Sequence, residues 1–284
     1  MEVFILIIIG IIGGLVAGSM GVGGGIIFTP VLFFLFDEAG IEHSVQWSVA
    51  SGLLCTFSAA LSSTIRQAIN KNIYLKEGIY LGFFGIIGVS LGKWILTSGY
   101  YQREQFVVFF SLILFYAAFM MFSKGRNRND ESNNSYTVFD AKSAFMTGGI
   151  GGSIATLAGV GGGIIMIPII NVLCKQPFRK TVSISHLGMC FLISVGLILL
   201  GTEDVSTSGI SAYHVGYIDI GAALPLAFGG LFGANFGTII NQKIHRKYLQ
   251  WGFTILATSM ACSLLWSVFG SYTSTSAYTF TRIE

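Results

Sequence analysis

The stretch at residues 21–30 reads Gly21-Val22-Gly23-Gly24-Gly25-Ile26-Ile27-Phe28-Thr29-Pro30, and residues 159–168 repeat it as Gly159-Val160-Gly161-Gly162-Gly163-Ile164-Ile165-Met166-Ile167-Pro168. The shared pattern, G-V-G-G-G-I-I-x-x-P, indicates an internal duplication of the chain. Four glycines within five positions disfavour a regular helix, so each copy predicts a break between two helical segments. A proline bends the helix that contains it, and we expect Pro30 and Pro168 to act as hinge or shape elements.

The composition of the 284 residues is that of a membrane protein. Hydrophobic residues make up 53% of the chain and charged residues only 10%, whereas soluble domains carry roughly 25% charged residues. Apolar runs long enough to cross a bilayer recur along the whole length. We therefore expect an all-α, multi-pass protein of the inner (cytoplasmic) membrane. The apolar segments lie at 3–36, 46–66, 78–98, 104–123, 143–174, 180–201, 213–240 and 247–270.

The duplication divides the chain into two membrane repeats. Residues 1–123 form the first repeat, residues 143–284 form the second, and the polar stretch 124–142 is predicted to be a cytoplasmic linker. Each repeat is predicted to consist of a broken, re-entrant helical hairpin followed by three transmembrane helices. Small residues four apart also correspond between the repeats, at Gly88 and Gly92 in the first and at Gly233 and Gly237 in the second. We expect these glycines to allow close helix packing.

Loop charges predict how the repeats sit in the membrane. In each pair of equivalent loops only one member is rich in Lys and Arg, and such loops lie in the cytoplasm. This assignment makes the two repeats inverted with respect to the bilayer, a common plan in secondary transporters. The alternative is one long kinked crossing at each break. The basic loops are 66–77, 174–181 and 241–247, and their equivalents are 201–212, 37–45 and 99–104.

The breaks themselves offer a binding site for an anion. An apolar helix follows each break, so the glycines lie at a helix N-terminus, where N–H groups are unpaired and the helix dipole is positive. Such a terminus binds anions without any charged side chain. Hairpins that enter from opposite faces bring both termini together near the bilayer midplane. Close packing alone is the alternative role for these glycines. The predicted binding glycines are Gly23, Gly24, Gly25, Gly161, Gly162 and Gly163.

A few polar side chains accompany the breaks. Ser51 and His186 occupy equivalent positions in the segments that follow the breaks, and Ser185 precedes His186. Hydroxyl groups can donate to an oxyanion, and a histidine can also carry a proton near neutral pH. Asn235 is a further polar residue within segment 213–240. We predict that all four contact the substrate, with hydrogen bonds to the local backbone as the alternative for the serines.

Several classes of function are not expected. The four histidines (His43, His186, His214 and His245) are scattered, and the four cysteines form no C-x-x-C pair, so the sequence predicts no enzyme, no metal site and no cofactor. No basic patch is interleaved with aromatic residues, which argues against nucleic acid as a partner. The expected partners are a small anion, a proton coupled to its movement, and the lipid bilayer.

The doubled G-x-G-G-G-I-I-x-x-P, near the start of each half of a membrane protein of this length, resembles the TauE/SafE, or sulfite exporter, family over nearly the whole chain. The resemblance implies transport of sulfur-containing oxyanions such as sulfite and organosulfonates, mostly by exporters that use the proton gradient or the membrane potential. We therefore predict a secondary transporter that works by alternating access. An anion channel, or a transporter of small carboxylates, is the alternative.

Overall fold

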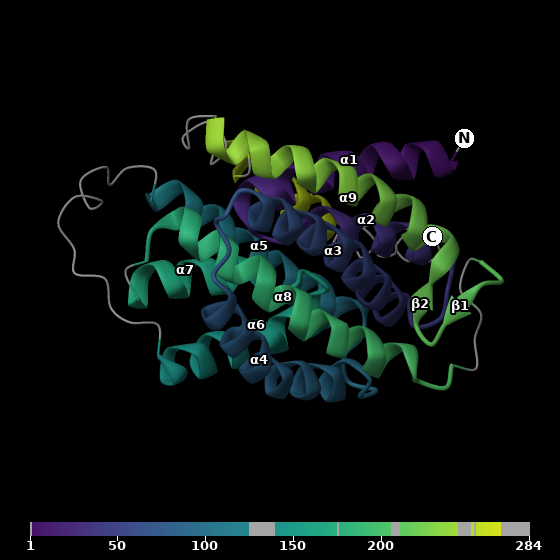
Figure 1. Cartoon of the computed structure of the whole chain (residues 1–284). Coiled ribbons are helices and arrows are strands. Elements are labelled where there is room, and N and C mark those ends of the chain that lie inside the picture. Colours follow the sequence, from purple (N-terminus) through teal and green to yellow (C-terminus); the bar gives the residue numbers. More distant parts are fainter. Residues whose placement is uncertain are drawn as a thin grey trace, which may run out of the picture.

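The computed structural model consists almost entirely of α-helices (Figure 1). The first half contains α1 (Glu2–Met20), α2 (Gly25–Glu38), α3 (Ser44–Ile69), α4 (Leu75–Leu96) and α5 (Arg103–Lys124). The second half contains α6 (Ala141–Ala158), α7 (Gly163–Leu173), α8 (Phe178–Gly201), α9 (Ile220–Lys243) and a further apolar helix, Thr254–Ser267. The structure describes residues 2–124, 140–174, 176–205, 211–243, 251–252 and 254–267.

The predicted polytopic helical fold is confirmed. Six of the described helices are long and apolar enough to cross a membrane. In each half, two helices flank the glycine-rich break and three more follow it, as the sequence predicts. The second helix of each pair is short. With 14 residues in α2 and 11 in α7, these helices are about 21 and 16 Å long, less than the roughly 30 Å of the hydrocarbon core.

A side-chain cap marks the start of α6. The Asp140 side chain accepts a hydrogen bond from Ser143 N at 3.0 Å and so caps the start of α6. This bond lowers the pKa of the Asp140 carboxyl below its ordinary value. Most of the predicted linker 124–142 lies outside the described residues, as do Lys175 and most of the predicted loop 241–247.

One stretch differs from the sequence-based segments. Residues 213–219 were expected to begin a membrane segment, but they contain β1 (His214–Val215) and β2 (Ile218–Asp219), which pair as an antiparallel hairpin. Gly216 at the turn has a φ of 53°, a conformation that favours glycine. The hairpin packs on the start of α3, where the Trp47 ring lies 5.3 Å from that of His214. Helix α9 therefore begins only at Ile220.

The two halves contact each other where α1 packs along α9 and where α4 packs along α6 (Figure 1). Glycines line both of these helix contacts. A Cβ on Gly88 would collide with Gly149 O, and a Cβ on Gly233 would collide with Ile11 O. The helix backbones approach so closely that only glycine fits, which confirms the predicted packing role of these positions. The remaining glycines in these two interfaces are Gly10, Gly14, Gly18, Gly229, Gly230 and Gly237, and Gly85, Gly92, Gly148, Gly149 and Gly152.

Helices α1 and α9 run in the same direction. Gly10 lies against Leu226, and eight residues further on Gly18 lies against Ala234.

Helices α4 and α6 also run in the same direction. Gly148 lies against Leu81, and Gly152 lies against Gly85. Each half thus contributes its first hairpin helix to a glycine-lined contact with the other half. The two contacts are equivalent under exchange of the halves.

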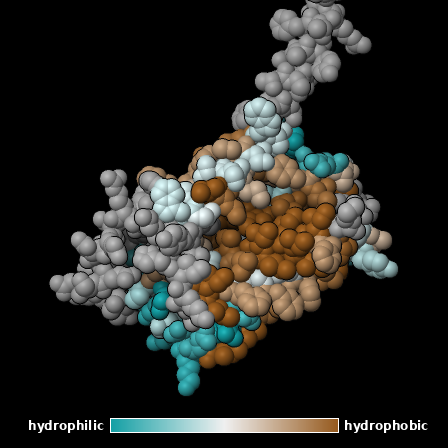
Figure 2. Space-filling view, turned by 90° about the horizontal axis from the view of Figure 1, so that it is seen from above, coloured by the Kyte–Doolittle hydropathy of each residue, from teal (hydrophilic) through white to brown (hydrophobic). Residues whose placement is uncertain are grey.

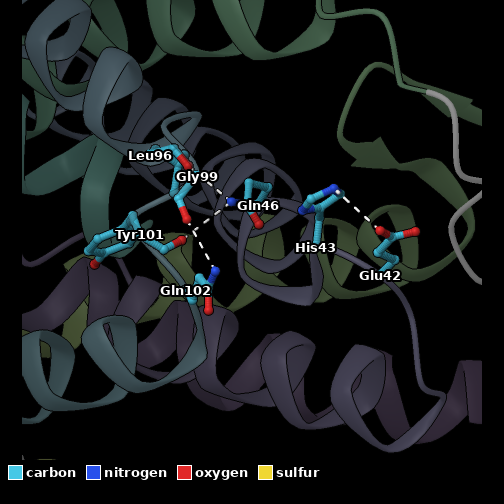
Figure 3. A network of polar contacts seen from close by, with 7 residues as sticks. All are labelled: Glu42, His43, Gln46, Leu96, Gly99, Tyr101 and Gln102. Atoms are coloured by element: carbon cyan, nitrogen blue, oxygen red, sulfur yellow. Dashed lines mark hydrogen bonds and ion pairs between the residues drawn. The ribbon is translucent and has the colours of Figure 1, made fainter.

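The loops that follow α2 and α4 lie at the same end of the molecule, and Figure 3 shows the polar contacts there. The Gln46 side chain donates from Nε2 to Leu96 O at 3.0 Å and to Tyr101 O at 3.5 Å. It therefore joins the start of α3 to the chain between α4 and α5. In the same loop, Gln102 Nε2 donates to Gly99 O at 3.1 Å.

Ion pairs bring further segments to this end. Arg103 Nη2 lies 2.9 Å from Asp37 Oδ2, and Lys93 pairs with Glu203 just after α8. Tyr217 N donates to Leu200 O at 3.2 Å, so the β hairpin and the start of α9 lie here too. Helix α4 ends at this end of the molecule and α9 begins at it, so the two helices run in opposite directions.

The opposite end holds the connection between α3 and α4 and the start of α8. Lys180 Nζ lies 3.3 Å from Glu77 Oε1 and 4.9 Å from the centre of the Tyr74 ring. Ser183 Oγ donates to Asn72 O at 2.7 Å.

The surface between the two ends is apolar. Large hydrophobic side chains are exposed along most of the helices, and Figure 2 shows a broad hydrophobic area on one face. Such a surface suits contact with lipid rather than water.

Candidate functional site

The two glycine-rich breaks, residues 21–24 (the first break) and 159–162 (the second break), contact each other in the interior. A Cβ on Gly25 would collide with Gly159 O, and a Cβ on Gly163 would lie 2.6 Å from Gly21 O and 3.0 Å from Val22 Cα. Every residue in 17–30 and 155–164 is buried. Each helix start therefore faces the other break.

Both breaks have the same backbone conformation, which explains their glycines. The first, third and fourth positions of each break have φ between 68° and 88°, the left-handed region that other residues adopt only at a cost. The fourth position in each case, Gly24 or Gly162, is the residue directly before the next helix. Val22 and Val160 are the only residues of the two breaks outside this conformation.

The N–H groups at the starts of α2 and α7 are unpaired. The first hydrogen bonds of these helices run from Ile27 N to Gly24 O at 2.9 Å and from Ile165 N to Gly162 O at 3.1 Å. Within the described part of the chain, no acceptor bonds to the N–H groups of residues 23–26 or 161–164. Buried N–H groups are nearly always paired in native proteins. Two clusters of donors therefore lie close together without an acceptor from the described part of the chain.

Carbonyl groups at the same place are already occupied. Gly159 O accepts hydrogen bonds from Thr29 Oγ1 at 3.0 Å and from Thr56 Oγ1 at 3.3 Å. Gly21 O accepts one from Ser185 Oγ at 3.4 Å. Each of these bonds links one half to the break of the other. At this contact the Gly21 and Gly159 carbonyls accept side-chain hydrogen bonds, whereas the N–H groups of the two helix starts have no acceptor within the described residues. Unpaired donors at a helix start favour a negatively charged ligand.

The side chains of Thr56 and Met189 pack against both breaks. A Cβ on Gly23 would lie 2.8 Å from Thr56 Cγ2 and 3.0 Å from Met189 Sδ, and a Cβ on Gly161 would lie 2.7 and 3.0 Å from the same atoms. The two side chains come from α3 and α8, the helices that follow the breaks. Neither residue was predicted from the sequence.

His186 is buried one residue beyond Ser185, beside the end of α1. Its Nδ1 lies 3.0 Å from Gln67 Nε2, and its Nε2 lies 3.2 Å from Ala17 O. A neutral ring that donates from Nε2 to the carbonyl and accepts at Nδ1 satisfies both contacts. His186 thus connects α8 to α1 and α3, and within the described residues it makes no hydrogen bond to the glycines of the breaks.

Within the described residues, neither Ser51 nor Asn235 forms a hydrogen bond to the breaks. Ser51 Oγ accepts a hydrogen bond from Asp219 N at 3.0 Å. Asp219 is fully buried and caps α9, because its carboxylate accepts from Ala222 N at 2.9 Å and from Ser211 N at 2.8 Å. Asn235 is half-buried on α9. Of the four predicted polar residues, only Ser185 bonds directly to a break.

The two prolines lie inside the short helices that follow the breaks. Pro30 is within α2 and Pro168 within α7, and both helices continue beyond them. Each proline lacks an N–H group, so the carbonyl four residues earlier loses its usual helical partner. A hinge role for these residues stays a prediction.

The polar residues that sequence reasoning missed share a feature. Thr56, Ser63 and Gln67 recur at helical spacing on one face of α3, and all three are buried. Thr29 lies within the repeated motif itself, at a position where the second copy has Ile167. A search for hydroxyl and amide groups on a single helical face would have found the α3 set.

Within the described residues, no group of His, Cys, Asp and Glu side chains could hold a metal ion.

Comparison with known proteins places the chain among transporters. The family described as "Sulfite exporter TauE/SafE" matches residues 6–264. The chain belongs to the TauE/SafE family. It is 30% identical to a "probable membrane transporter protein" of Methanocaldococcus jannaschii, over 87% of this chain and 89% of that protein. It is 28% identical to the "probable membrane transporter protein YunE" of Bacillus subtilis, over 94% and 98% of the two chains.

A further relative, also a "probable membrane transporter protein", comes from Haemophilus influenzae; it is 29% identical over 72% of this chain and 84% of that protein. No solved structure matches the chain. Membership in the TauE/SafE family, together with six apolar helices of sufficient length, makes the chain a multi-pass membrane transporter. This confirms the resemblance and the transport function that the sequence predicts.

Proposed function

We propose that the chain is a secondary transporter that exports small sulfur-containing anions, such as sulfite or an organosulfonate, and binds them between the two breaks near the bilayer midplane. The observation that carries the proposal is the pair of helix starts whose buried N–H groups have no acceptor within the described residues. A sulfite or sulfonate group is compact and carries several acceptor oxygens, so it suits donors that converge from two sides.

The proposal includes inverted repeats. Helix α1 runs parallel to α9, its counterpart α6 runs parallel to α4, and α4 and α9 run in opposite directions. Helices α1 and α6 therefore oppose each other, which supports the inversion predicted from the loop charges. On this proposal a cysteine at Arg179 is labelled only from the cytoplasmic side and one at Glu42 only from the outer side. Labelling of both from one side would exclude inversion.

Alternating access is favoured over a channel by the burial of the site. The residues of both breaks are covered from either end of the molecule, so an anion bound there would be enclosed. Passage then requires the packing between the halves to change, and an opening to one side at a time is the simplest such change. A carrier of this kind shows saturation and counter-flow.

We also propose that His186 carries the coupled proton. In its neutral form the ring accepts a hydrogen bond from Gln67 and donates one to Ala17 O. A second proton on the ring removes the lone pair at Nδ1, so the Gln67 amide must turn its oxygen toward the ring. Protonation thus changes a contact between α3 and α8. Flux that has the same pH dependence in wild type and in His186→Gln would exclude this role.

Transport by purified protein in liposomes tests the main proposal. Wild type should take up radiolabelled sulfite or sulfoacetate with saturation, and unlabelled anion on the opposite side should accelerate uptake. The double variant Gly24→Leu with Gly162→Leu should lose this flux, because a side chain at each position fills the start of a helix. The control is Gly99→Leu with Gly149→Leu, two positions where an added Cβ meets nothing within 4 Å. Equal flux in both double variants would exclude the breaks as the site. Linear, non-saturating flux would favour the channel.

A further inference from the structure

Helix α3 carries buried polar groups that lead from the breaks to one end of the molecule. Thr56 lies at the breaks, Ser63 lies two turns further along and Gln67 one turn beyond that, on the same face of the helix. All three side chains are buried. Gln67 is near the end that holds the Lys180–Glu77 pair, which the loop charges predict to be cytoplasmic. For an exporter, this is the side on which the substrate enters.

Ser63 is a buried serine of α3 whose hydroxyl has no hydrogen-bond partner within the described residues. Its side chain is fully buried, and no acceptor or donor in the described part of the chain bonds to Oγ. The neighbouring Ser62 donates to Leu231 O at 2.6 Å, and Ser58 donates to Ala227 O at 2.9 Å. Those serines bind α9, whereas Ser63 faces the side of α3 that contacts α8. A buried hydroxyl without a partner is costly and calls for a ligand or a water.

A cationic side chain stands next to this hydroxyl. Arg66 follows Ser63 by three residues and Ser62 by four, so it lies between these two serines on the helix surface. Its Nε atom is buried and has no hydrogen-bond partner, and the described residues give it no ion pair. The Nε of Arg103, near the other end of the molecule, is also buried without a partner, but the Arg103 guanidinium forms an ion pair with Asp37. The guanidinium of Arg66 can therefore offer its donors to an anion.

We propose that Ser63 and Arg66 form a second anion site, on the predicted cytoplasmic side of the breaks, where the substrate is collected before it reaches them. This inference rests on the proposed function. It assigns the loading path to the interface between α3 and α8, from the Gln67–His186 contact to the point where Thr56 and Met189 pack on the breaks. The ligand class is a small oxyanion, because a guanidinium and a hydroxyl together match a sulfonate or sulfite group.

Cysteine accessibility tests the path. In a background where the four native cysteines are replaced and transport is retained, Ser63→Cys should react with a membrane-impermeant sulfonate-bearing thiol reagent added from the cytoplasmic side. Sulfoacetate should slow this reaction, whereas sulfite is unsuitable as a protectant because it attacks disulfides. The matched control Ser58→Cys, whose native hydroxyl donates to Ala227 O of α9, should not react. Equal reactivity at the two positions, or no reaction of Ser63→Cys in a protein that still transports, would overturn the proposal.

Kinetics of Arg66 variants provide the second test. Arg66→Gln should raise the half-saturating sulfite concentration on the cytoplasmic side about tenfold, the usual effect of losing one charge-assisted contact. Maximal flux should change little, Arg66→Lys should recover most of the affinity, and Arg103→Gln should leave it unchanged. An unaltered half-saturating concentration in Arg66→Gln would overturn the second site. Absence of any anion flux in wild type would instead refute the proposed function itself.

Discussion

Replacing Gly24 with alanine separates the two reasons why the breaks require glycine. At Gly24 the φ of 76° imposes backbone strain, and an added Cβ would lie 2.7 Å from Phe28 Cε2 and 3.0 Å from Gly13 O. Left-handed strain costs roughly 1–2 kcal/mol, and overpacking in a filled interior typically adds about 1–3 kcal/mol. We therefore expect Gly24→Ala to lose roughly 2–5 kcal/mol of folding free energy.

Two control variants separate the cost of backbone strain from the cost of overpacking. Gly40 has a φ of 67° but nothing within 4 Å of an added Cβ, so Gly40→Ala carries the strain alone, roughly 1–2 kcal/mol. Gly149 lies within α6, also with open space, so Gly149→Ala should stabilise by about 0.5–1 kcal/mol through helix propensity.

Thermal unfolding of the purified protein in detergent measures these differences. At roughly 2–4 °C per kcal/mol, Gly24→Ala should lower the unfolding temperature by roughly 4–20 °C, Gly40→Ala by less, and Gly149→Ala not at all. Sulfite flux should fall only in Gly24→Ala. If Gly24→Ala unfolds at the same temperature as Gly40→Ala, close packing at the first break is not a constraint and the reasoning fails.

Three further changes test the contacts around the site. Asp219→Ala removes the cap of α9 and should cost about 1–2 kcal/mol, seen as a lower unfolding temperature that Asp219→Asn partly restores. Gly233→Leu forces α9 away from Ile11 O, so we expect loss of folded protein by size-exclusion chromatography, and a normal elution profile would contradict the glycine contact. Thr29→Val removes one hydrogen bond to Gly159 O and should cost about 1–3 kcal/mol; Thr29→Ser should behave as wild type, and equal loss in both variants would assign the effect to packing instead.

The breaks and the helices around them were predictable because their signals are local. Four glycines in five residues are incompatible with a regular helix wherever the chain runs, and Gly24 and Gly162 do adopt conformations that favour glycine. Glycines four residues apart, as at Gly88, likewise indicate close helix contact from spacing alone.

The side chains around the breaks were harder to predict because helix rotation decides what each one meets. Ser51 and Thr56 are five residues apart on α3, which turns their side chains about 140° from each other. Ser51 therefore bonds to Asp219 at the start of α9, whereas Thr56 bonds to Gly159 O at the second break. The sequence offered both hydroxyls but not the orientation of the helix. That orientation follows from the packing of the two halves.

For His186 too, the contacts depend on helix orientation, even in comparison with the adjacent residue. It follows Ser185 directly, and one residue along a helix turns the side chain by about 100°. Ser185 consequently bonds to Gly21 O, while His186 bonds to Ala17 O and Gln67. The equivalence of Ser51 and His186 in the duplicated sequence predicts equal positions along α3 and α8, but the two helices have different neighbours.

Binding of radiolabelled sulfite to the purified protein, measured by equilibrium dialysis without oxygen, tests the central claim most directly. The account predicts saturable binding to wild type and to the Gly99→Leu, Gly149→Leu control, and loss of that binding in the Gly24→Leu, Gly162→Leu variant. The anion should also protect wild type against thermal unfolding. Undiminished sulfite binding in a folded Gly24→Leu, Gly162→Leu protein would contradict the assignment of the anion to the two glycine-rich breaks.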